Sequence, residues 1–432
     1  LSGGKSSRLY NGLVYDQQLA VEVMSQADLP QQPGLIAVAA ILSSGQDVAA
    51  GEAALLAEVA RLRDAPVSAA ELDEAKNELL AGELRSRETV DGRAFALGYA
   101  WAVSGDPAAA NRQLADLTAV TAADVQRAAR RYLAEARRMT IFYRNEDERP
   151  ADAPAAPEPA PVAASVAFDG EVIALAPEDE RQAPPPPGEP VSPTLPTPAE
   201  TTLSNGLRVV VARSSDLPLI SATLIVRAGA WADPQGEAGA MSMTAGMLTE
   251  GAGARTAPQI AQAGESLGAP LSAGAGRESS SVSLTALSDK IAQALEIMAD
   301  VVRRPTFAPE ELERQRAQAL DGLSVALQSP GQVAAMAAGP VVFAGTPFGQ
   351  VADGTPASLP RLTPERLAQL HAAHYRPDNA ILVLTGDVTP QAGFALAKAA
   401  FGDWVNPAGP APVQPPVTPQ APRQVVAIDL PG

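Results

Sequence analysis

The sequence contains no cysteine and only two histidines, His371 and His374, and these scarcities remove several kinds of chemistry. Without thiols the chain cannot form disulfides, use a thiolate nucleophile or bind zinc through cysteine. There is also no G-x-S-x-G elbow, and only the two histidines could act as the base for a serine nucleophile. Acidic residues are plentiful, but no pair is marked as a catalytic acid and base. The residues alone therefore indicate no catalytic site.

Aromatic residues and long apolar runs are also scarce. Aromatic residues make up 4% of the chain, whereas 46% is hydrophobic, with Ala supplying much of that share. We therefore expect helix-rich cores built from Ala, Leu and Val. No apolar run reaches the ~18 residues that a bilayer requires, so we expect no membrane span. The formal net charge of −17 repels phosphate backbones, so no nucleic-acid partner is expected.

Proline is unevenly distributed along the chain. Fourteen of the 40 prolines lie between Pro150 and Glu200. Because proline lacks a backbone donor and interrupts helices and sheets, we predict a Pro-rich linker at residues 149–200. Within it, VAFDGEVIAL (166–175) is a short island that could add a strand or dock on a neighbouring segment.

The length of 432 residues suits two or three domains of roughly 150 residues each. The chain begins LSGGKSSRLY, with no methionine and no visible signal peptide, and it stops soon after a strand-like run, VVAIDLPG. We therefore expect a piece of a longer protein.

Hydrophobic periodicity predicts strands and helices on both sides of the linker. The expected strands lie at 35–42, 138–144, 207–213, 220–229, 279–287 and 379–387. The expected helices lie at 6–20, 46–65, 68–86, 121–136, 236–250, 257–267, 290–304, 309–328, 363–375 and 389–401. Ser68 with Glu71 suggests a capping box, and Thr363 with Pro364 marks another helix start. The predicted fold class is α+β, with repeated units of antiparallel sheet covered by helices.

Two pairs of segments repeat at nearly the same offset, which argues for duplicated units. SAAELDEAKNELLAGEL near residue 68 matches APEELERQRAQALDGL near residue 308, with Glu71 and Glu311 separated by 240 positions. The segment from Thr121 matches the segment from Thr363, at an offset of 242.

The opening LSGGKSS invites two nucleotide-binding interpretations, and the sequence favours neither. An ABC-type signature should be followed by an apolar strand that ends in Asp-Glu, but LIAVAAILSSGQD has no such pair. A phosphate-binding loop needs a glycine five residues before Gly4, after a strand, and neither can be seen. We predict instead a Gly-rich turn that leads into a helix.

His371 and His374 lie at i and i+3 on a predicted helix, so both could face one metal ion. Two ligands do not make a metal site, and a third would have to come from elsewhere, for example Glu365 or Asp378. We predict that the two histidines cap or pack the end of the helix.

Several longer stretches fit one pattern. They are TLSNGLRVVVARSSDLPLISATLIVRAGAWADPQGEAGAMSMTAGMLTEGAGART, SLGAPLSAGAGRESSSVSLTAL, ALEIMADVVRRPTFAPEELERQR and HYRPDNAILVLTGDV, which cover nearly all of 201–408. Together they resemble the pitrilysin/insulinase family of zinc metallopeptidases, whose relatives include mitochondrial processing peptidase and the core subunits of the cytochrome bc1 complex. LSGGKSSRLYNGLVYDQQLA resembles the Gly-rich turn, Ser-Arg-Leu and helix in the second half of a family domain.

The resemblance implies three parts. Residues 1–148 correspond to the C-terminal half of a first family domain, and residues 149–200 form the linker. Residues 201–432 correspond to the N-terminal half of a second family domain.

Peptidases of this family carry His-x-x-Glu-His on the helix after the first strands, where two His bind zinc and the Glu activates the metal-bound water. The resemblance places Ser242, Ala245 and Gly246 at these positions, and Gly322 at a more distant Glu ligand on a later helix. None of the four can usefully bind zinc or move a proton. The resemblance therefore implies a degenerate zinc motif, with no catalytic or metal-binding residue in this chain and with unknown substrate-binding residues.

The family also uses an Arg and a Tyr to steady the scissile carbonyl group. In the first domain the corresponding positions fall near Val14 and Val21, where neither residue type is present. The pair of the second domain would follow Gly432.

By this resemblance, the chain is part of a zinc-dependent metalloendopeptidase that encloses and hydrolyses peptides or small proteins, and it supplies the non-catalytic wall and interface. Zinc is expected upstream of Leu1, with none bound here. The alternative is an inactive partner or scaffold subunit of a processing-peptidase-like complex. The implied partners are a peptide or small-protein substrate and, left open, a second subunit in a homo- or hetero-dimer. Bacterial family members suggest a periplasmic location.

Overall fold

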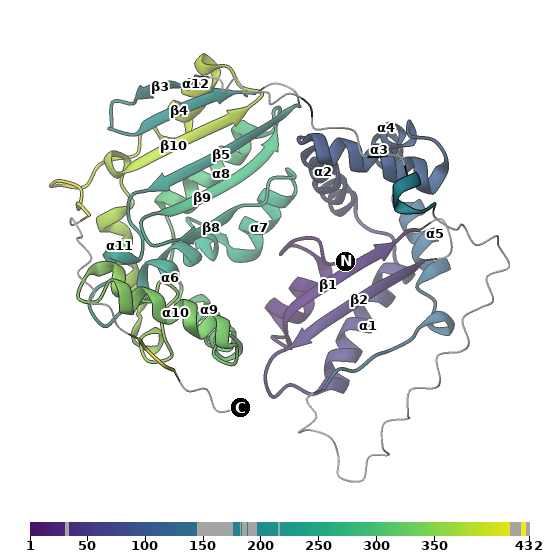
Figure 1. Cartoon of the computed structure of the whole chain (residues 1–432), viewed down its shortest axis with the longest axis horizontal. Helices are drawn as coiled ribbons and strands as arrows, with labels where there is room; N and C mark the ends of the chain where they lie inside the picture. The colour runs from purple at the N-terminus through teal and green to yellow at the C-terminus, as the bar shows by residue number, and fades with distance from the viewer. Residues whose placement is uncertain are drawn as a thin grey trace, which may run out of the picture. The chain divides into compact units, whose positions relative to one another are not determined.

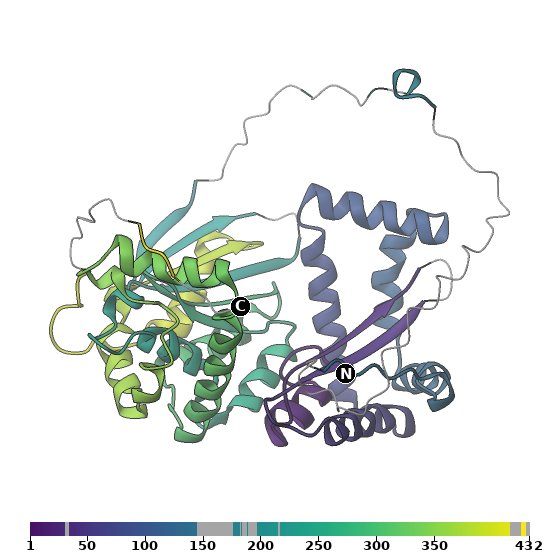
Figure 2. The ribbon, with the colours of Figure 1, turned by 60° about the horizontal axis from the view of Figure 1, so that its bottom comes forward.

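The structure is a computed structural model that describes residues 1–30, 34–144, 176–181, 183, 188, 197–214, 217–414 and 425–428. Residues 135–195 form one unit, and residues 1–134 together with 196–432 form another, which we call the main unit. Figures 1 and 2 show the ribbon from two directions.

The described strands all lie in the main unit. They are β1 (Ala20–Asp28), β2 (Leu35–Leu42), β3 (Ala199–Thr202), β4 (Arg208–Arg213), β5 (Leu219–Val226), β6 (Gly251–Ala252), β7 (Arg255–Thr256), β8 (Ser272–Ala275), β9 (Ser280–Leu287) and β10 (Ala380–Gly386).

The described α-helices also lie in the main unit. They are α1 (Val48–Asp64), α2 (Ala69–Ser86), α3 (Val90–Ser104), α4 (Ala109–Ala119), α5 (Ala122–Tyr132), α6 (Ala240–Gly246), α7 (Ala257–Glu265), α8 (Ile291–Arg303), α9 (Pro309–Ala326), α10 (Pro330–Val342), α11 (Pro364–His374) and α12 (Pro390–Phe401).

A six-stranded sheet organises the part of the main unit after the linker. Its strand order is β3-β4-β10-β5-β9-β8, and every pairing is antiparallel except that of β4 with β10, which is parallel. Side chains along β5, β9 and β10 alternate between buried and half-buried. Successive side chains of a strand point to opposite faces of the sheet, so this alternation means that one face of the sheet packs against the hydrophobic core.

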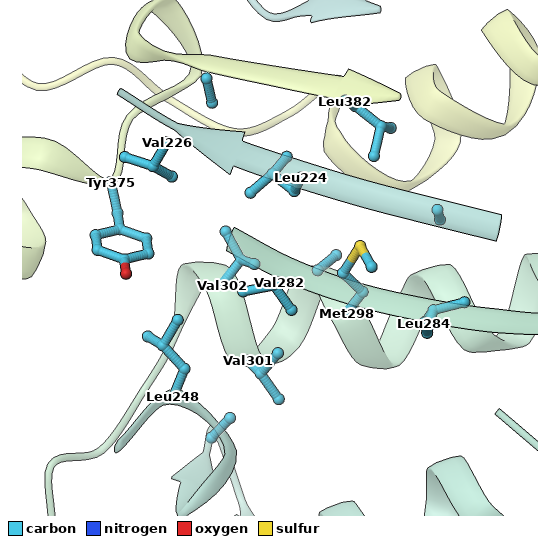
Figure 3. Close-up of a cluster of buried hydrophobic side chains, with 14 of the residues drawn as sticks. Leu224, Val226, Leu248, Val282, Leu284, Met298, Val301, Val302, Tyr375 and Leu382 are labelled. Atoms are coloured by element: carbon cyan, nitrogen blue, oxygen red, sulfur yellow. The ribbon is translucent and has the colours of Figure 1, made fainter. Parts of the chain in front are cut away.

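Helices cover the buried face of this sheet because their apolar stripes meet it. α8 packs on β9, and α12 packs on β4 and against α8. Figure 3 shows Leu224 and Val282 from the sheet beside Met298 and Val302 from α8. In α12, a Cβ on Gly393 would lie 2.8 Å from the Val211 side chain, so glycine lets the helix approach β4 closely.

A second, two-stranded antiparallel sheet, β1 with β2, belongs to the residues before the linker. α1 packs on β2 and on α5. The core here is small, and its fully buried members are Leu9, Leu13, Val14 and Ala20. A sheet of two strands buries little surface, so the packing of the neighbouring helices must supply much of the stability.

Most of the predicted elements are confirmed. The strand predicted at 35–42 is β2, and those at 207–213, 220–229, 279–287 and 379–387 are β4, β5, β9 and β10, with ends that differ by up to three residues. The α+β class and the sheets covered by helices are confirmed. Thr363 Oγ1 accepts a hydrogen bond from the Arg366 N–H, as an N-cap should. Ser68 likewise caps α2 by accepting from the Glu71 N–H, but the Glu71 carboxylate pairs with Arg8.

The strand predicted at 138–144 is wrong. These residues have no regular structure, and Met139, Ile141 and Tyr143 are 84%, 83% and 100% exposed. An apolar, β-branched run becomes a strand only when a neighbour pairs with its backbone groups, and no described strand does so here.

Two predicted helices have different boundaries. The helix predicted at 6–20 is a π-helix at Tyr10–Asp16, and β1 follows at Ala20 where no strand was predicted. The helix predicted at 236–250 starts only at Ala240, because Gly236 and Gly239 have φ of 83° and 86°. Such left-handed residues end or precede a helix instead of extending it. α3, α4 and α10 were not predicted.

Of the predicted linker, the structure describes only 176–181, 183, 188 and the residues from 197, so the island at 166–175 lies outside the described residues. The division of the chain into two family domains and a linker, with boundaries at residues 148 and 200, stays a prediction. Among the residues described, no helix is both long enough and apolar enough to cross a bilayer.

Candidate functional site

α6 carries the three residues that the sequence aligns with a zinc motif. Ser242 and Gly246 lie one turn apart and are both half-buried, whereas Ala245 is fully buried. The helix therefore brings these positions together as expected, with one face partly open. Neither a hydroxyl, a methyl group nor a hydrogen atom supplies the imidazole or carboxylate ligands that zinc needs, so these residues do not fit the metal.

The glycines at two of the four motif positions are not required by packing. A Cβ built on Gly246 or on Gly322 would meet no atom within 4 Å. Gly322 lies on α9 and is exposed, and α9 contacts the 3-10 helix Met247–Thr249 that follows α6. The idea that small residues are present to let two helices pack closely is therefore not supported at these two positions.

The N-terminus of α6 is fixed by a buried carboxylate. Asp233 Oδ2 accepts from the Gly239 N–H at 2.8 Å, and Oδ1 accepts from the Met241 N–H at 2.7 Å. Burial raises the pKa of Asp233 to about 7, although the backbone donors oppose this rise. The helix orientation thus rests on a side chain that the sequence pattern did not single out.

An unpaired strand edge lies beside α6. The helix packs against β8 and β9. Within the described residues β8 is the last strand of its sheet, so its outer backbone groups pair with no other strand. β8 has the sequence Ser-Ala-Gly-Ala, and a Cβ on Gly274 would meet nothing within 4 Å. Small side chains leave this edge open to an extended peptide.

A partly buried ionic cluster joins the first residues of the chain to α9, and we call it the ionic junction. It consists of Lys5, Tyr15, Glu250, Glu311 and Arg314. Lys5 Nζ donates to Glu250 Oε1 at 2.8 Å, and Arg314 Nη2 donates to Glu250 and, at 2.7 Å, to Glu311 Oε2. Tyr15 OH donates to Glu311 Oε1 at 2.8 Å. Burial and the Glu311 carboxylate raise the pKa of Tyr15 to about 12.

Sequence reasoning missed the ionic junction. Its members come from residues 5–15, 250 and 311–314, and no local pattern links such distant positions. The single available signal is Glu250 itself, a charged residue two positions after the apolar pair Met247–Leu248.

The Gly-rich turn predicted at the start of the chain is confirmed, since residues 3–7 form bends and turns before the π-helix. The positions near which the family's Arg and Tyr would fall are Val14, buried in the π-helix, and Val21, half-buried on β1. Both side chains are aliphatic and can stabilise no oxyanion.

A cleft of about 1020 Å³ is lined by side chains from residues 1–79, Val125 and Gln262, with Ser6, Arg8 and Glu71 among them. Arg8 forms a two-fold hydrogen bond with Glu71, and Arg61 pairs with Glu58, so both arginines in the cleft are neutralised.

The two histidines pack the end of α11, as predicted. His371 Nε2 donates to the Val302 carbonyl at 2.8 Å, and its ring stacks on Tyr375. The His374 ring meets Trp231 edge-on. Among the described residues, no group of three or more His, Asp or Glu could hold a metal ion.

Acidification should therefore destabilise the fold through His371. Burial lowers its pKa below the ordinary 6.5, so below that pH the unfolded chain takes up a proton that the folded chain refuses. The His371 contribution to the free energy of unfolding then falls as the pH drops from 7.5 to 5.5, whereas Asp233, with its raised pKa, contributes in the opposite direction. In His371→Phe, which keeps a ring against Tyr375, this part of the pH dependence should disappear. Urea titrations of both proteins at the two pH values measure it, and equal pH dependence would contradict the assignment.

Comparison with known proteins agrees with this architecture. The insulinase family (peptidase family M16) matches residues 208–348, and the M16 inactive domain matches residues 1–79 and 361–431. The chain belongs to the pitrilysin/insulinase family of peptidases.

Individual relatives are distant and longer. A protein of Rickettsia bellii described as an uncharacterized zinc protease is 27% identical over 186 residues, covering 43% of this chain and 45% of the relative. A zinc protease of Mycobacterium tuberculosis H37Rv, also described as uncharacterized, is 28% identical over 208 residues, covering 48% of this chain and 47% of the relative. Subunit 1 of the bovine cytochrome b-c1 complex is 26% identical over 208 residues, covering 48% and 43%. The chain spans about half the length of the curated relatives it matches.

Among solved structures, an M16 inactive domain from Pseudomonas fluorescens is 29% identical, with a TM-score of 0.49, and covers 52% of this chain and 54% of that chain. Pitrilysin is 19% identical, with a TM-score of 0.47, and covers 52% and 25%.

Proposed function

We propose that this chain forms the non-catalytic wall of a zinc-dependent metalloendopeptidase that encloses and hydrolyses peptides or small proteins. The catalytic zinc belongs to a part of that protein outside these 432 residues. In this proposal the chain binds and holds the substrate and makes no bond-breaking contribution of its own.

One observation carries the proposal: a helix without zinc ligands lies beside an open strand edge. In α6, Ser242, Ala245 and Gly246 replace the ligands and the base of the family motif. The neighbouring β8 can still accept an extended peptide through its free backbone N–H and C=O groups. Loss of the metal with retention of the edge suits a surface that binds peptides without cleaving them. Backbone pairing also explains why no substrate identity is readable from side chains.

The proposal predicts that the chain retains no stoichiometric zinc after dialysis and still binds an unstructured peptide. Replacing alternate peptide N–H groups with N-methyl groups should weaken binding about tenfold or more, because each lost hydrogen bond on a sheet edge is worth about 1 kcal/mol. Zinc is measured by atomic emission, and peptide binding by fluorescence anisotropy.

Two outcomes would contradict it. One tight zinc ion per chain would show that the alignment at α6 is wrong. Equal binding of the methylated and unmethylated peptides would show that backbone pairing is not the mode of recognition.

The second candidate function is an inactive partner or scaffold subunit beside a catalytic chain. The match to the M16 inactive domain and the similarity to subunit 1 of the bovine b-c1 complex favour it. The two candidates separate in the full-length protein. Zinc-dependent peptide hydrolysis by that protein alone supports the first, whereas hydrolysis that needs a second, different chain supports the other. We also propose a periplasmic location for the whole protein, which cell fractionation tests.

A further inference from the structure

The turn at residues 3–6 directs its backbone donors at one carboxylate of the same chain. The Lys5 N–H donates to Glu265 Oε1 at 2.8 Å, and the Ser6 N–H donates to Oε2 at 2.9 Å. The Ser6 hydroxyl also donates to Oε2. Glu265 is the last residue of α7 and is only 5% exposed. Three donors therefore converge on a single buried anion.

Glycine at position 4 makes this arrangement possible. Gly4 has a φ of 70°, in the left-handed region, and a Cβ on it would lie 2.3 Å from the Glu265 carboxylate. Consecutive N–H groups that follow such a residue form a concave nest for an anion. The GGKSS segment looked like part of a phosphate-binding loop because it has this backbone chemistry, but here the anion is a side chain of the protein.

We propose that the turn at residues 3–6 is a receptor for small carboxylates, which the chain fills with Glu265 to fix its first residues on α7. The receptor binds the two oxygens of a carboxylate, so a free carboxylate of the right size can take the place of the side chain. Acetate carries the same atoms that Glu265→Ala removes. It should therefore bind to that variant and restore the contact.

Neighbouring acids limit the strength of the receptor. The single proton of the Ser6 hydroxyl is shared between Glu265 and Glu74, because Glu74 Oε1 also lies within hydrogen-bond range of that hydroxyl. The Glu78 carboxylate lies against Gly3. Burial and the Glu265 charge raise the pKa of both Glu74 and Glu78. This repulsion opposes a second anion, so one carboxylate at a time can bind, and a millimolar dissociation constant is expected for acetate. Gly3 and Ser6 line the cleft of about 1020 Å³, which gives solutes access.

The experiment is a chemical rescue. Glu265→Ala should unfold at a lower temperature than the wild-type chain, because two backbone donors lose their partner. Sodium acetate should recover at least half of that loss, whereas sodium chloride at the same ionic strength should not. The wild-type midpoint should respond equally to the two salts. If acetate helps the variant no more than chloride, the proposal is wrong.

Two further measurements test whether acetate acts at the turn of residues 3–6. In Glu265→Ala/Gly4→Ala, the new methyl group occupies the place of the anion, so rescue by acetate should vanish; persistence would show that acetate acts elsewhere. Lys5 is one of four lysines, with Lys76, Lys290 and Lys398, so 15N-lysine labelling resolves its amide. That amide alone should shift, saturably, when acetate is added to Glu265→Ala.

Glu265→Gln keeps the volume of the side chain and guards against a failure of the alanine variant to fold. Its neutral amide should move the Lys5 resonance away from its wild-type position, and acetate should have no effect because the receptor stays filled. A Lys5 resonance unchanged by Glu265→Gln would overturn the proposal, since the turn would then not sense the charge.

Discussion

Replacing Glu250 with alanine is expected to lower the free energy of unfolding by about 3–5 kcal/mol, the usual penalty for removing one partner of a buried ion pair. The Glu250 side chain is 2% exposed and lies between Lys5 and Arg314. Arg314 is only 10% exposed, so without Glu250 its charge stays buried with Glu311 as the remaining partner. Lys5 is nearly half exposed and can turn to water. Most of the loss should therefore come from Arg314.

A double-mutant cycle tests this division. Glu250→Gln/Arg314→Met removes both charges, so it should be less destabilising than the sum of the single changes, with a coupling energy of about 1–3 kcal/mol. The exposed pair Arg208–Glu200 is the matched control, and Glu200→Ala should change stability by no more than about 0.5 kcal/mol. Urea unfolding at one pH measures every variant. Additive effects of Glu250→Gln and Arg314→Met would show that the two charges are not coupled.

The elements that could be predicted are those whose own residues determine them. β9 alternates strictly over its eight residues and β5 over its last seven, and Thr363-Pro364 starts α11 through local hydrogen bonding and a fixed φ. The failure at 138–144 has the opposite cause. The apolar pattern of these residues is as strong as that of a real strand. A strand also needs a second strand to pair with, and the local sequence does not show whether one is available.

The same distinction between local and distant determinants applies to the candidate site. The positions of Ser242, Ala245 and Gly246 on one helix followed from spacing and family resemblance. The carboxylate contacts of the ionic junction and of the turn at residues 3–6 could not be predicted, because the partners are far apart in the sequence. Glu265 meets Lys5 and Ser6 across some 260 residues, and Glu250 meets Lys5 across 245. In a chain with 49 acidic residues, sequence alone does not indicate which ones become buried.

Neighbouring substitutions on α6 should have opposite effects. Ala245→Glu, which places a carboxylate where the family resemblance aligns the general base, is expected to lower the free energy of unfolding by roughly 3–5 kcal/mol. The reason is that Ala245 is fully buried, and a carboxylate there would be overpacked and without a partner. Gly246→Ala should instead raise the free energy of unfolding by about 0.5–1 kcal/mol, since the residue has helical φ and ψ of −59° and −38° and its new methyl group meets no atom.

The different expected effects at Ala245 and Gly246 bear on whether a zinc site could be built on α6 by introducing the family's ligands alone. Gly246 has room for a side chain, whereas the position of the base has been filled by the surrounding core. On the alignment proposed above, we therefore expect Ser242→His with Gly246→His to provide at most a metal-binding pair, without the carboxylate that activates water. Thermal and urea unfolding of the two single variants decide the point. If Ala245→Glu is as stable as the wild-type chain, position 245 has room for a carboxylate, and the expected incompatibility is wrong.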